Sequence, residues 1–330
     1  MAKVKIKIDA YSGYGNKNKI YCLGRVLVNK EMTITDEDSF IKHAVSVYKN
    51  AESDEIPWQK MQFTFAGETE TIYTNTEGFY LIEDQFEDFV PKRLVEEIQL
   101  EINTEDFEKK WLNKELKAKG KIFYKSKNAK FGVISDIDDT ILKTDVLSTM
   151  KWKIFYNTLF IKASKRMPIK DANIWYQKLS EGTGNNNNPF FYVSHSPWNL
   201  YNYLQEFLNI NEFPEGPVLL RDFGLKAKDA LQDYENHKRN EVIRILKMYP
   251  KLNFILIGDG GEKDAHIYLK LKKRFPKRIA AIFIHRLGNK AHQAKIEAIT
   301  EGHEDYFFFV KNAKEATEIS KKLGFIAEDN

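Results

Sequence analysis

Two patterns of hydrophobic and polar residues divide the chain. Up to about residue 124 the apolar positions alternate with polar ones, as in Val4, Ile6 and Ile8. Such alternation is typical of strands with one buried face. It recurs in residues 20–28, 62–65, 70–73, 78–82 and 95–102. Thr76-Glu77-Gly78 between two of these stretches predicts a hairpin turn that needs glycine. Helical periodicity is confined to residues 39–48, so we expect a small antiparallel β-sandwich here.

From residue 131 onward the apolar residues form continuous runs instead. These runs are residues 131–134, 190–193, 216–221, 253–257, 279–284 and 306–310. Strands buried on both faces of a parallel sheet have this composition. Helical spacing predicts helices between and after them, at residues 150–166, 172–179, 234–248, the stretch before residue 275, and 313–323. Alternating strands and helices indicate an α/β domain.

A polar stretch separates the two patterns. Residues 125–130 contain three lysines and no large apolar residue. Domain boundaries fall in such stretches. We therefore predict two domains, residues 1–125 and residues 126–330.

Composition narrows the class of protein. The 330 residues are 42% hydrophobic and carry a net charge of +4, which gives no reason to expect a nucleic acid partner. The only cysteine, Cys22, excludes an internal disulfide and a cysteine-based zinc site, and fits a reducing cytosol. The first residues lack the apolar run of a signal peptide, and no apolar run is long enough to span a bilayer. A cytoplasmic protein is expected.

Carboxylates gather directly after the first continuous apolar run. Asp136, Asp138 and Asp139 follow residues 131–134, and Thr140 comes next. Ligands of open α/β sheets bind at the carboxyl ends of the strands. Crowded carboxylates repel one another unless a cation neutralises them, which suggests Mg²⁺ and one carboxylate free to act as a nucleophile.

Two other interpretations of these acids compete with a Mg²⁺ site. An EF-hand loop starting at Asp136 would need Gly at its sixth position and Glu at its twelfth. The chain has Ile141 and Leu147 there, so an EF-hand is excluded. A strand that merely ends in an acidic turn stays open on this evidence.

Three later stretches add candidate residues for binding a phosphate group. Ser194 follows residues 190–193, just before Ser196 and Pro197, which predict the capped start of a helix and hence an anion site. Lys238 lies near the predicted start of the helix at 234–248, which is unfavourable for a cation unless an anion binds nearby. The alternatives are a turn serine and a solvated lysine.

The run at residues 253–257 also ends in polar residues. It leads into Gly258, Asp259 and, five residues further, Asp264. Because parallel strands end at one edge of a sheet, these acids should lie at the same edge as Asp136. His195 is a weaker candidate for an acid or base, since the carboxylates already supply that chemistry.

The D-x-D-x-T pattern formed by Asp136, Asp138 and Thr140 resembles the signature of haloacid-dehalogenase-type phosphatases. The resemblance implies a Rossmann-like catalytic domain with a small helical cap inserted at about residues 145–188. It also implies that Asp136 is the nucleophile, that Asp138 is the acid and base, and that Thr140 restrains Asp138.

The remaining roles follow from the same resemblance. Thr140, Ser194 and Lys238 would bind the phosphoryl group. Asp136, Asp138 and Asp259 would hold Mg²⁺. Asp264 would orient Lys238 or a metal-bound water.

A narrower resemblance rests on the order of five motifs. These are DIDDT, YVSHSPW, LLRDFG, HK and GDGGEKD, between residues 131 and 287. They resemble the actin-patch-associated phosphatidate phosphatase family, which implies a Mg²⁺-dependent phosphatidate phosphatase. His195 and Gly260 stand where serine is common in the family, so substrate preference stays open. The alternatives are a phosphatase for a soluble ester and a non-catalytic scaffold.

The predicted cap contains a segment that suits a membrane surface. Residues 148–167 interleave aromatic side chains with five lysines and arginines. This composition suits a helix in the interface of an anionic membrane, although packing of the cap onto the core is the more common reason for such an apolar stripe. Phosphatidate at a membrane surface is therefore the expected partner, with a protein partner for the N-terminal domain left open.

Overall fold

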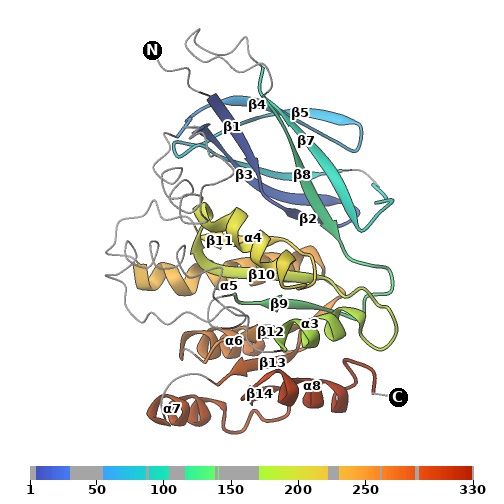
Figure 1. Cartoon of the computed structure of the whole chain (residues 1–330), viewed down its shortest axis with the longest axis vertical. Helices are drawn as coiled ribbons and strands as arrows, with labels where there is room; N and C mark the ends of the chain where they lie inside the picture. Colours follow the sequence, from blue (N-terminus) through green and yellow to red (C-terminus); the bar gives the residue numbers. More distant parts are fainter. Residues whose placement is uncertain are drawn as a thin grey trace, which may run out of the picture. The chain divides into compact units, whose positions relative to one another are not determined.

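The computed structural model describes residues 5–29, 55–86, 89–103, 116–137, 140, 171–221, 230–260, 262–286 and 290–328. The chain divides into two compact units: the first holds the described residues up to Tyr124, and the second those from Lys125 onward (Figure 1). Asp138, the predicted helices at 39–48 and 150–166, and most of the predicted cap lie outside the described residues.

The first unit is built of β-strands. They are β1 (Lys5–Ala10), β2 (Gly13–Gly15), β3 (Lys19–Asn29), β4 (Lys60–Phe65), β5 (Glu68–Tyr73), β6 (Phe79–Gln85), β7 (Val95–Glu101) and β8 (Lys117–Tyr124). Their order in the sheet is β1-β3-β2-β8-β7-β4-β5, with β6 paired to β3. The pairs are antiparallel except for β2 with β8.

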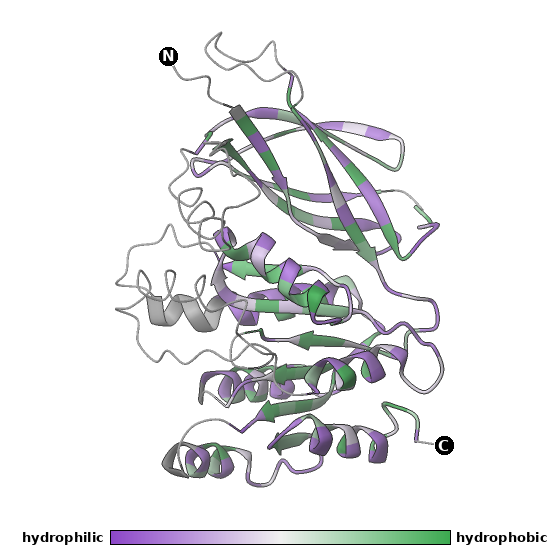
Figure 2. Ribbon diagram, in the orientation of Figure 1, coloured by the Kyte–Doolittle hydropathy of each residue, from purple (hydrophilic) through white to green (hydrophobic). Residues whose placement is uncertain are grey.

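One hydrophobic cluster fills this unit. It combines Ile8 of β1, Phe65 of β4, Tyr80 of β6 and Ile98 of β7. Strands near opposite ends of the sheet thus contribute to the same core, which means that the sheet curves around it. Apolar and polar residues alternate along the strands, as period-two packing requires (Figure 2).

The turn before β6 differs from the sequence prediction. Gly78 does adopt a left-handed conformation with φ of 74°, and its N–H donates to the Asn75 carbonyl at 3.1 Å. The turn does not join a hairpin, because β5 pairs with β4 and β6 pairs with β3. Short alternating runs fix which face of a strand is buried but leave the partner strand undetermined.

Strand β5 forms one end of this sheet. Five of its six residues are exposed, among them Glu68 and Glu70. The neighbouring Asp84 on β6 raises the pKa of Glu70, mainly through charge repulsion.

The second unit contains a parallel six-stranded sheet. Its strands are β9 (Phe131–Ser135), β10 (Phe190–Pro197), β11 (Val218–Arg221), β12 (Asn253–Gly258), β13 (Ile279–His285) and β14 (Phe307–Val310). Its helices are α3 (Ala172–Glu181), α4 (Tyr201–Ile210), α5 (Ala230–Met248), α6 (Glu262–Arg274), α7 (Lys290–Thr300) and α8 (Ala313–Lys322), with the short 3₁₀ helix η4 (Trp198–Leu200). The predicted α/β class is confirmed.

The strand order is β11-β10-β9-β12-β13-β14. Numbered within this unit it reads 3-2-1-4-5-6, so the side on which successive strands are added to the sheet reverses between β9 and β12. In doubly wound sheets of this order, ligands bind at that reversal, outside the carboxyl ends of the strands. The topology thus places Asp136, which directly follows β9, at the expected ligand crevice.

Two local predictions for this unit are wrong, and one helix was not predicted. Strand β10 continues through Pro197, so Ser196 does not cap a helix, and Pro197 itself precedes η4 in an extended conformation. Helix α5 begins at Ala230, so Lys238 lies about two turns inside it rather than near its start. Helix α7 was not predicted, because its apolar positions are few.

The loop after α3 has a structural role that the sequence did not suggest. Asn188 is buried, and its side-chain amide donates to the Leu179 carbonyl at 2.8 Å. Its oxygen accepts from the backbone N–H of Lys130 at 2.9 Å. Asn188 therefore ties the end of α3 to the start of β9.

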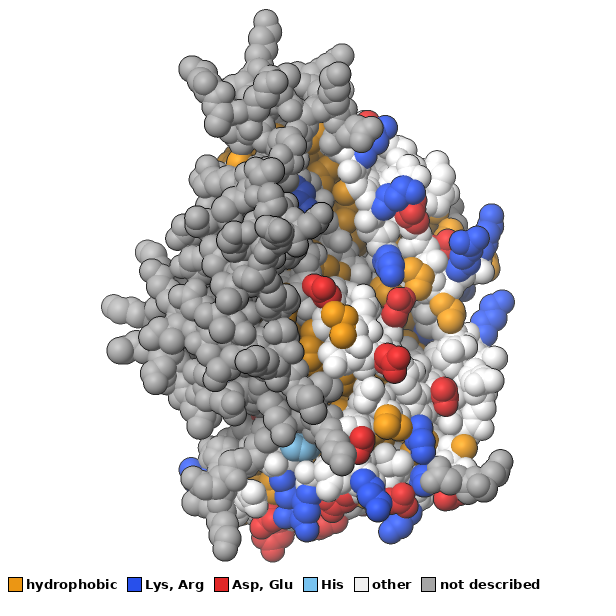
Figure 3. Space-filling view, viewed as in Figure 1, with side chains coloured by type: hydrophobic (Ala, Val, Ile, Leu, Met, Phe, Trp, Pro, Cys, Tyr) orange, Lys and Arg blue, Asp and Glu red, His pale blue; other side chains and the backbone are white. Residues whose placement is uncertain are grey.

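None of the helices in the described residues combines the length and apolar character needed to cross a membrane. Over the part of the surface that is described on one face, lysine, arginine, aspartate and glutamate side chains are intermixed (Figure 3).

Candidate active site

Asp136 stands where β9 leaves the sheet. Strand β9 is fully buried and pairs with β10 on one side and β12 on the other. The Asp136 N–H continues this pairing by donating to the Ile257 carbonyl of β12 at 2.9 Å. The residue is only 3% exposed, so its carboxylate needs a partner inside the protein.

Lys238 supplies that partner from α5. Its Nζ lies 3.1 Å from Asp136 Oδ1 and 2.6 Å from Asp264 Oδ1. The three side chains are between 0% and 4% exposed. A lysine buried this deeply is stable as a cation only when paired, and here two carboxylates pair with it. The three groups together carry a formal charge of −1, which favours binding of a further cation close by.

Asp264 reaches this position because residue 258 has no side chain. A Cβ on Gly258 would lie 2.5 Å from Asp264 Oδ2, closer than atoms can approach. The same oxygen accepts from the Asp259 N–H at 3.4 Å. The strand end and the first turn of α6 therefore hold the carboxylate from two sides.

Tyr268 lies close to Asp264 and to the end of β12. Its hydroxyl donates to the Ile257 carbonyl at 3.2 Å. Burial raises the pKa of Tyr268 well above its usual value, and the charge of Asp264 adds to the effect. The phenol therefore remains a neutral donor beside the charged groups.

The other predicted residues take their places at the same edge. The Thr140 hydroxyl is 3.4 Å from Asp136 Oδ2. Ser194 is fully buried within β10, one residue beyond the level of Asp136, and its Oγ accepts from the Ser196 N–H at 2.9 Å. Asp259 follows β12 and is partly exposed. Lys238 is thus not solvated, and Ser194 makes a local hydrogen bond within its strand.

His195 contacts a second histidine. Its ring and that of His237 on α5 are 5.7 Å apart between centroids and nearly perpendicular. These two residues directly neighbour Ser194 and Lys238 in the sequence. The pairing was not predicted, since nothing in the sequence relates residues so far apart.

The donor chemistry at this edge fits a hard metal ion. Asp136 and Asp259 follow the paired strands β9 and β12 and offer carboxylate oxygens, the ligands that Mg²⁺ prefers. Within the described residues no group of three or more acidic, histidine or cysteine side chains is arranged as a complete metal site. Asp138, the further predicted ligand, lies outside these residues.

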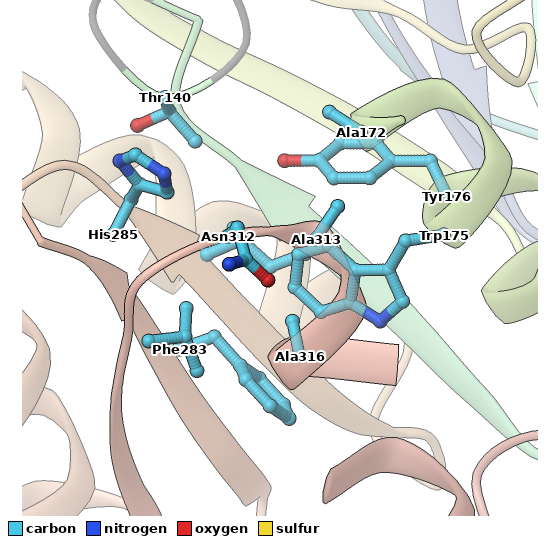
Figure 4. Close-up of a pocket in the computed structure, with 11 residues that line it drawn as sticks. Thr140, Ala172, Trp175, Tyr176, Phe283, His285, Asn312, Ala313 and Ala316 are labelled. Atoms are coloured by element: carbon cyan, nitrogen blue, oxygen red, sulfur yellow. The ribbon is translucent and has the colours of Figure 1, made fainter. Parts of the chain in front are cut away.

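A small pocket of about 20 Å³, enough for one water molecule, is lined by Thr140 and by residues of the sheet and of helices α3 and α8. Thr140 and His285 form one side of it, and Trp175 and Tyr176 of α3 face them (Figure 4). Ala313 and Ala316 of α8 line its floor. The pocket is mainly apolar, apart from Thr140, His285, Asn312 and the Tyr176 hydroxyl.

Two hydroxyl groups next to this pocket were missed by the sequence analysis. Ser135 Oγ donates to the Asp136 carbonyl at 2.6 Å, and it lies 2.8 Å from the Tyr176 hydroxyl. Burial raises the pKa of Tyr176 above its usual value. A serine within an apolar strand was a possible signal for Ser135, but nothing in the sequence pointed to Tyr176.

Comparison with known proteins matches residues 131–286 to a family described as "Phosphatidate phosphatase APP1, catalytic domain". Phosphatidate phosphatase APP1 of Saccharomyces cerevisiae is 35% identical over 159 residues, which are 48% of this chain and 26% of that protein. An uncharacterized protein of Schizosaccharomyces pombe is 28% identical over 218 residues, 64% of this chain and 34% of that protein. The chain thus spans between a quarter and about a third of these relatives' length.

A carbohydrate acetylesterase from Xanthomonas citri is among the solved structures with some similarity. It shares 8% identity and a TM-score of 0.31 over 94% of this chain and 72% of that one. A similarity this low does not establish a common fold.

Proposed function

Because residues 131–286 match the family described as the phosphatidate phosphatase APP1 catalytic domain, we propose that the chain is a Mg²⁺-dependent phosphatase that hydrolyses phosphatidate. The proposal includes a covalent aspartyl-phosphate intermediate on Asp136. It also takes the second unit to be a Rossmann-like haloacid-dehalogenase-type domain with a cap, and the first unit to be a β-sandwich accessory domain.

The observation that carries the proposal is the buried group of Asp136, Lys238 and Asp264. A phosphate dianion and a carboxylate nucleophile repel each other, so a fixed cation must lie beside both of them. Lys238 Nζ is 3.1 Å from Asp136 Oδ1, and Asp264 at 2.6 Å fixes its position. A structural ion pair would need one carboxylate, whereas two carboxylates and a lysine at a ligand crevice suit phosphoryl transfer.

In the first step an Asp136 oxygen attacks phosphorus. The bond from phosphorus to Asp136 forms while the bond to the ester oxygen breaks. Asp138, as a carboxylic acid, gives its proton to that oxygen, and the alcohol, diacylglycerol, leaves. Lys238 and Ser194 bind the non-bridging oxygens of the phosphoryl group.

In the second step the Asp138 carboxylate takes a proton from water. The water oxygen attacks phosphorus, the bond to Asp136 breaks, and inorganic phosphate leaves. Both aspartates then return to their starting protonation states. Thr140 holds Asp138 in place throughout, according to the resemblance.

Mg²⁺ would be held by Asp136, Asp138 and Asp259, where it would offset the negative charge of the phosphate and the nucleophile. The proposal also places the protein in the cytoplasm. Because phosphatidate presents its phosphate at a membrane surface, the protein would contact that membrane peripherally. Protein partners of the first unit are left open.

The test compares phosphate release from phosphatidate in mixed micelles with release from a panel of soluble phosphate esters. Activity on phosphatidate that requires Mg²⁺ and disappears in Asp136→Asn is the expected result. Asp305→Asn serves as the control, because it removes an exposed carboxylate of the same unit.

Four results would count against the proposal. Turnover in excess chelator would exclude the metal-dependent mechanism. Full activity of Asp136→Asn would exclude the covalent intermediate. Release from soluble esters alone would show that a soluble ester, and not phosphatidate, is the substrate. No turnover on any ester would favour a non-catalytic scaffold.

A further inference from the structure

Two hydroxyl groups in series, those of Tyr176 on α3 and of Ser135, hold the main chain of Asp136 by hydrogen bonds. Strand β9 ends at Ser135, so Asp136 is the first residue beyond the strand. Ser135 Oγ donates to this carbonyl at 2.6 Å. The Asp136 N–H is bound separately, by the Ile257 carbonyl of β12 at 2.9 Å. Both peptide groups of Asp136 therefore have a fixed partner.

The direction of the second hydrogen bond follows from the first. A serine hydroxyl has one proton, and Ser135 uses it on the Asp136 carbonyl. The Tyr176 hydroxyl, 2.8 Å away, must then donate to Ser135 Oγ. Ser135 and Tyr176 are 0% and 1% exposed, so bulk solvent does not reach either residue. Two polar groups buried in this way are costly unless they bond each other.

The ring of Tyr176 is clamped by its neighbours. Trp175 and Phe213 contact it edge to face, with centroids 5.3 Å and 5.4 Å away, and Phe190 lies at 5.5 Å. The hydroxyl thus has little freedom to move from Ser135. Burial and the nearby Asp136 charge both raise the pKa of this phenol, which remains a proton donor at any working pH.

We propose that Tyr176 is a positioning residue for the reaction, which holds the Asp136 main chain through Ser135 and so aims the Asp136 carboxylate. This inference rests on the proposed function, in which Asp136 is the nucleophile. The placement also connects α3, the first described helix after residues 141–170, to the reacting group. Small displacements of a reacting atom have large effects on rate, so loss of the hydrogen bonds from Tyr176 to Ser135 and from Ser135 to Asp136 should lower kcat.

The experiment uses Tyr176→Phe, Ser135→Ala and the double variant in the full chain. Tyr192→Phe is the matched control, because its hydroxyl is equally buried and donates to a backbone carbonyl, that of Pro214, at 2.8 Å. We expect Tyr176→Phe and Ser135→Ala each to lower kcat about tenfold, equivalent to about 1.4 kcal/mol of activation free energy. KM should stay within twofold, since Ser194 and Lys238 are untouched. The double variant should be no worse than Ser135→Ala, because the two hydroxyls act in series.

A second measurement does not depend on the reaction. Hydrogen exchange of the Asp136 amide should be faster in Tyr176→Phe and Ser135→Ala than in Tyr192→Phe. Unchanged exchange, or a kcat for Tyr176→Phe equal to that of Tyr192→Phe, overturns the positioning role. Faster exchange in a chain whose wild type hydrolyses no phosphate ester supports the hydrogen-bond chain and refutes the proposed function instead.

Discussion

Removing the charge of Lys238 should destabilise the second unit far more than removing a lysine from an exposed ion pair. At an effective dielectric constant of 20, the contacts at 3.1 Å and 2.6 Å correspond to about 5 and 6 kcal/mol of Coulomb attraction. Desolvation of the buried lysine offsets part of this attraction. Breaking a buried pair and leaving its carboxylates behind costs about 3–5 kcal/mol, and we expect that loss for Lys238→Met.

Lys119 provides the matched control. Its Nζ lies 2.9 Å from Glu97, a distance between the two above, but the two side chains are 69% and 49% exposed. Pairs of this kind contribute about 0–1 kcal/mol, so Lys119→Met should have little effect.

Calorimetry of the full chain is the appropriate assay, because two units can unfold in separate transitions. For a unit of this size, a loss of 3–5 kcal/mol lowers Tm by roughly 10 °C. Adding Asp136→Asn to Lys238→Met should recover part of the loss, since one buried carboxylate then remains instead of two. A decrease no larger than that of Lys119→Met, or no recovery in the double variant, would show that the buried charges are not coupled as described.

Three further outcomes are expected. Gly258→Ala should lower activity at least tenfold, because its Cβ would displace the Asp264 carboxylate that holds Lys238. Gly67→Ala is the comparison, because nothing lies within 4 Å of its added Cβ and any strain there comes from the backbone φ of 90°. A fully active Gly258→Ala would refute the packing argument. Arg278→Met should cost about 1–3 kcal/mol in urea unfolding, because the guanidinium donates to the Leu246, Tyr249 and Leu252 carbonyls at the end of α5, and Arg278→Lys should not rescue it. Burial raises the pKa of Cys22 to about 12, so a thiol reagent at pH 8 should modify the native chain roughly a thousandfold more slowly than the urea-unfolded chain, and equal rates would contradict the burial.

The sequence was most informative where burial on both faces leaves a continuous apolar run. Strands β9, β10, β12 and β13 were predicted this way, and with them the position of Asp136 at the edge of a parallel sheet. Strand β8 was missed although Lys117, Lys119 and Lys121 alternate with Ala118, Gly120 and Ile122, which is a period-two signal. The lysines made the segment look solvated, whereas they occupy only one face of it.

The chemistry of the site was less predictable than its location. Lys238 could be proposed from its motif, but a lysine has the same local pattern whether it is solvated or buried. Its burial depends on Asp136 and Asp264, which come from other elements. Tyr176 shows the same limitation, because its partner Ser135 is 41 residues away and the helix that carries it reads as an ordinary amphipathic segment.

Strand β5 affects how the protein behaves in concentrated solution. An exposed end strand offers unpaired main-chain groups to a second copy of the chain, and charged side chains are a common defence against such edge-to-edge aggregation. Glu68 and Glu70 provide this defence along β5. Because Asp84 raises the pKa of Glu70, that residue takes up its proton at a higher pH than an isolated glutamate as the solution is acidified. Mild acid therefore removes a repulsive charge from the sheet edge and favours self-association there.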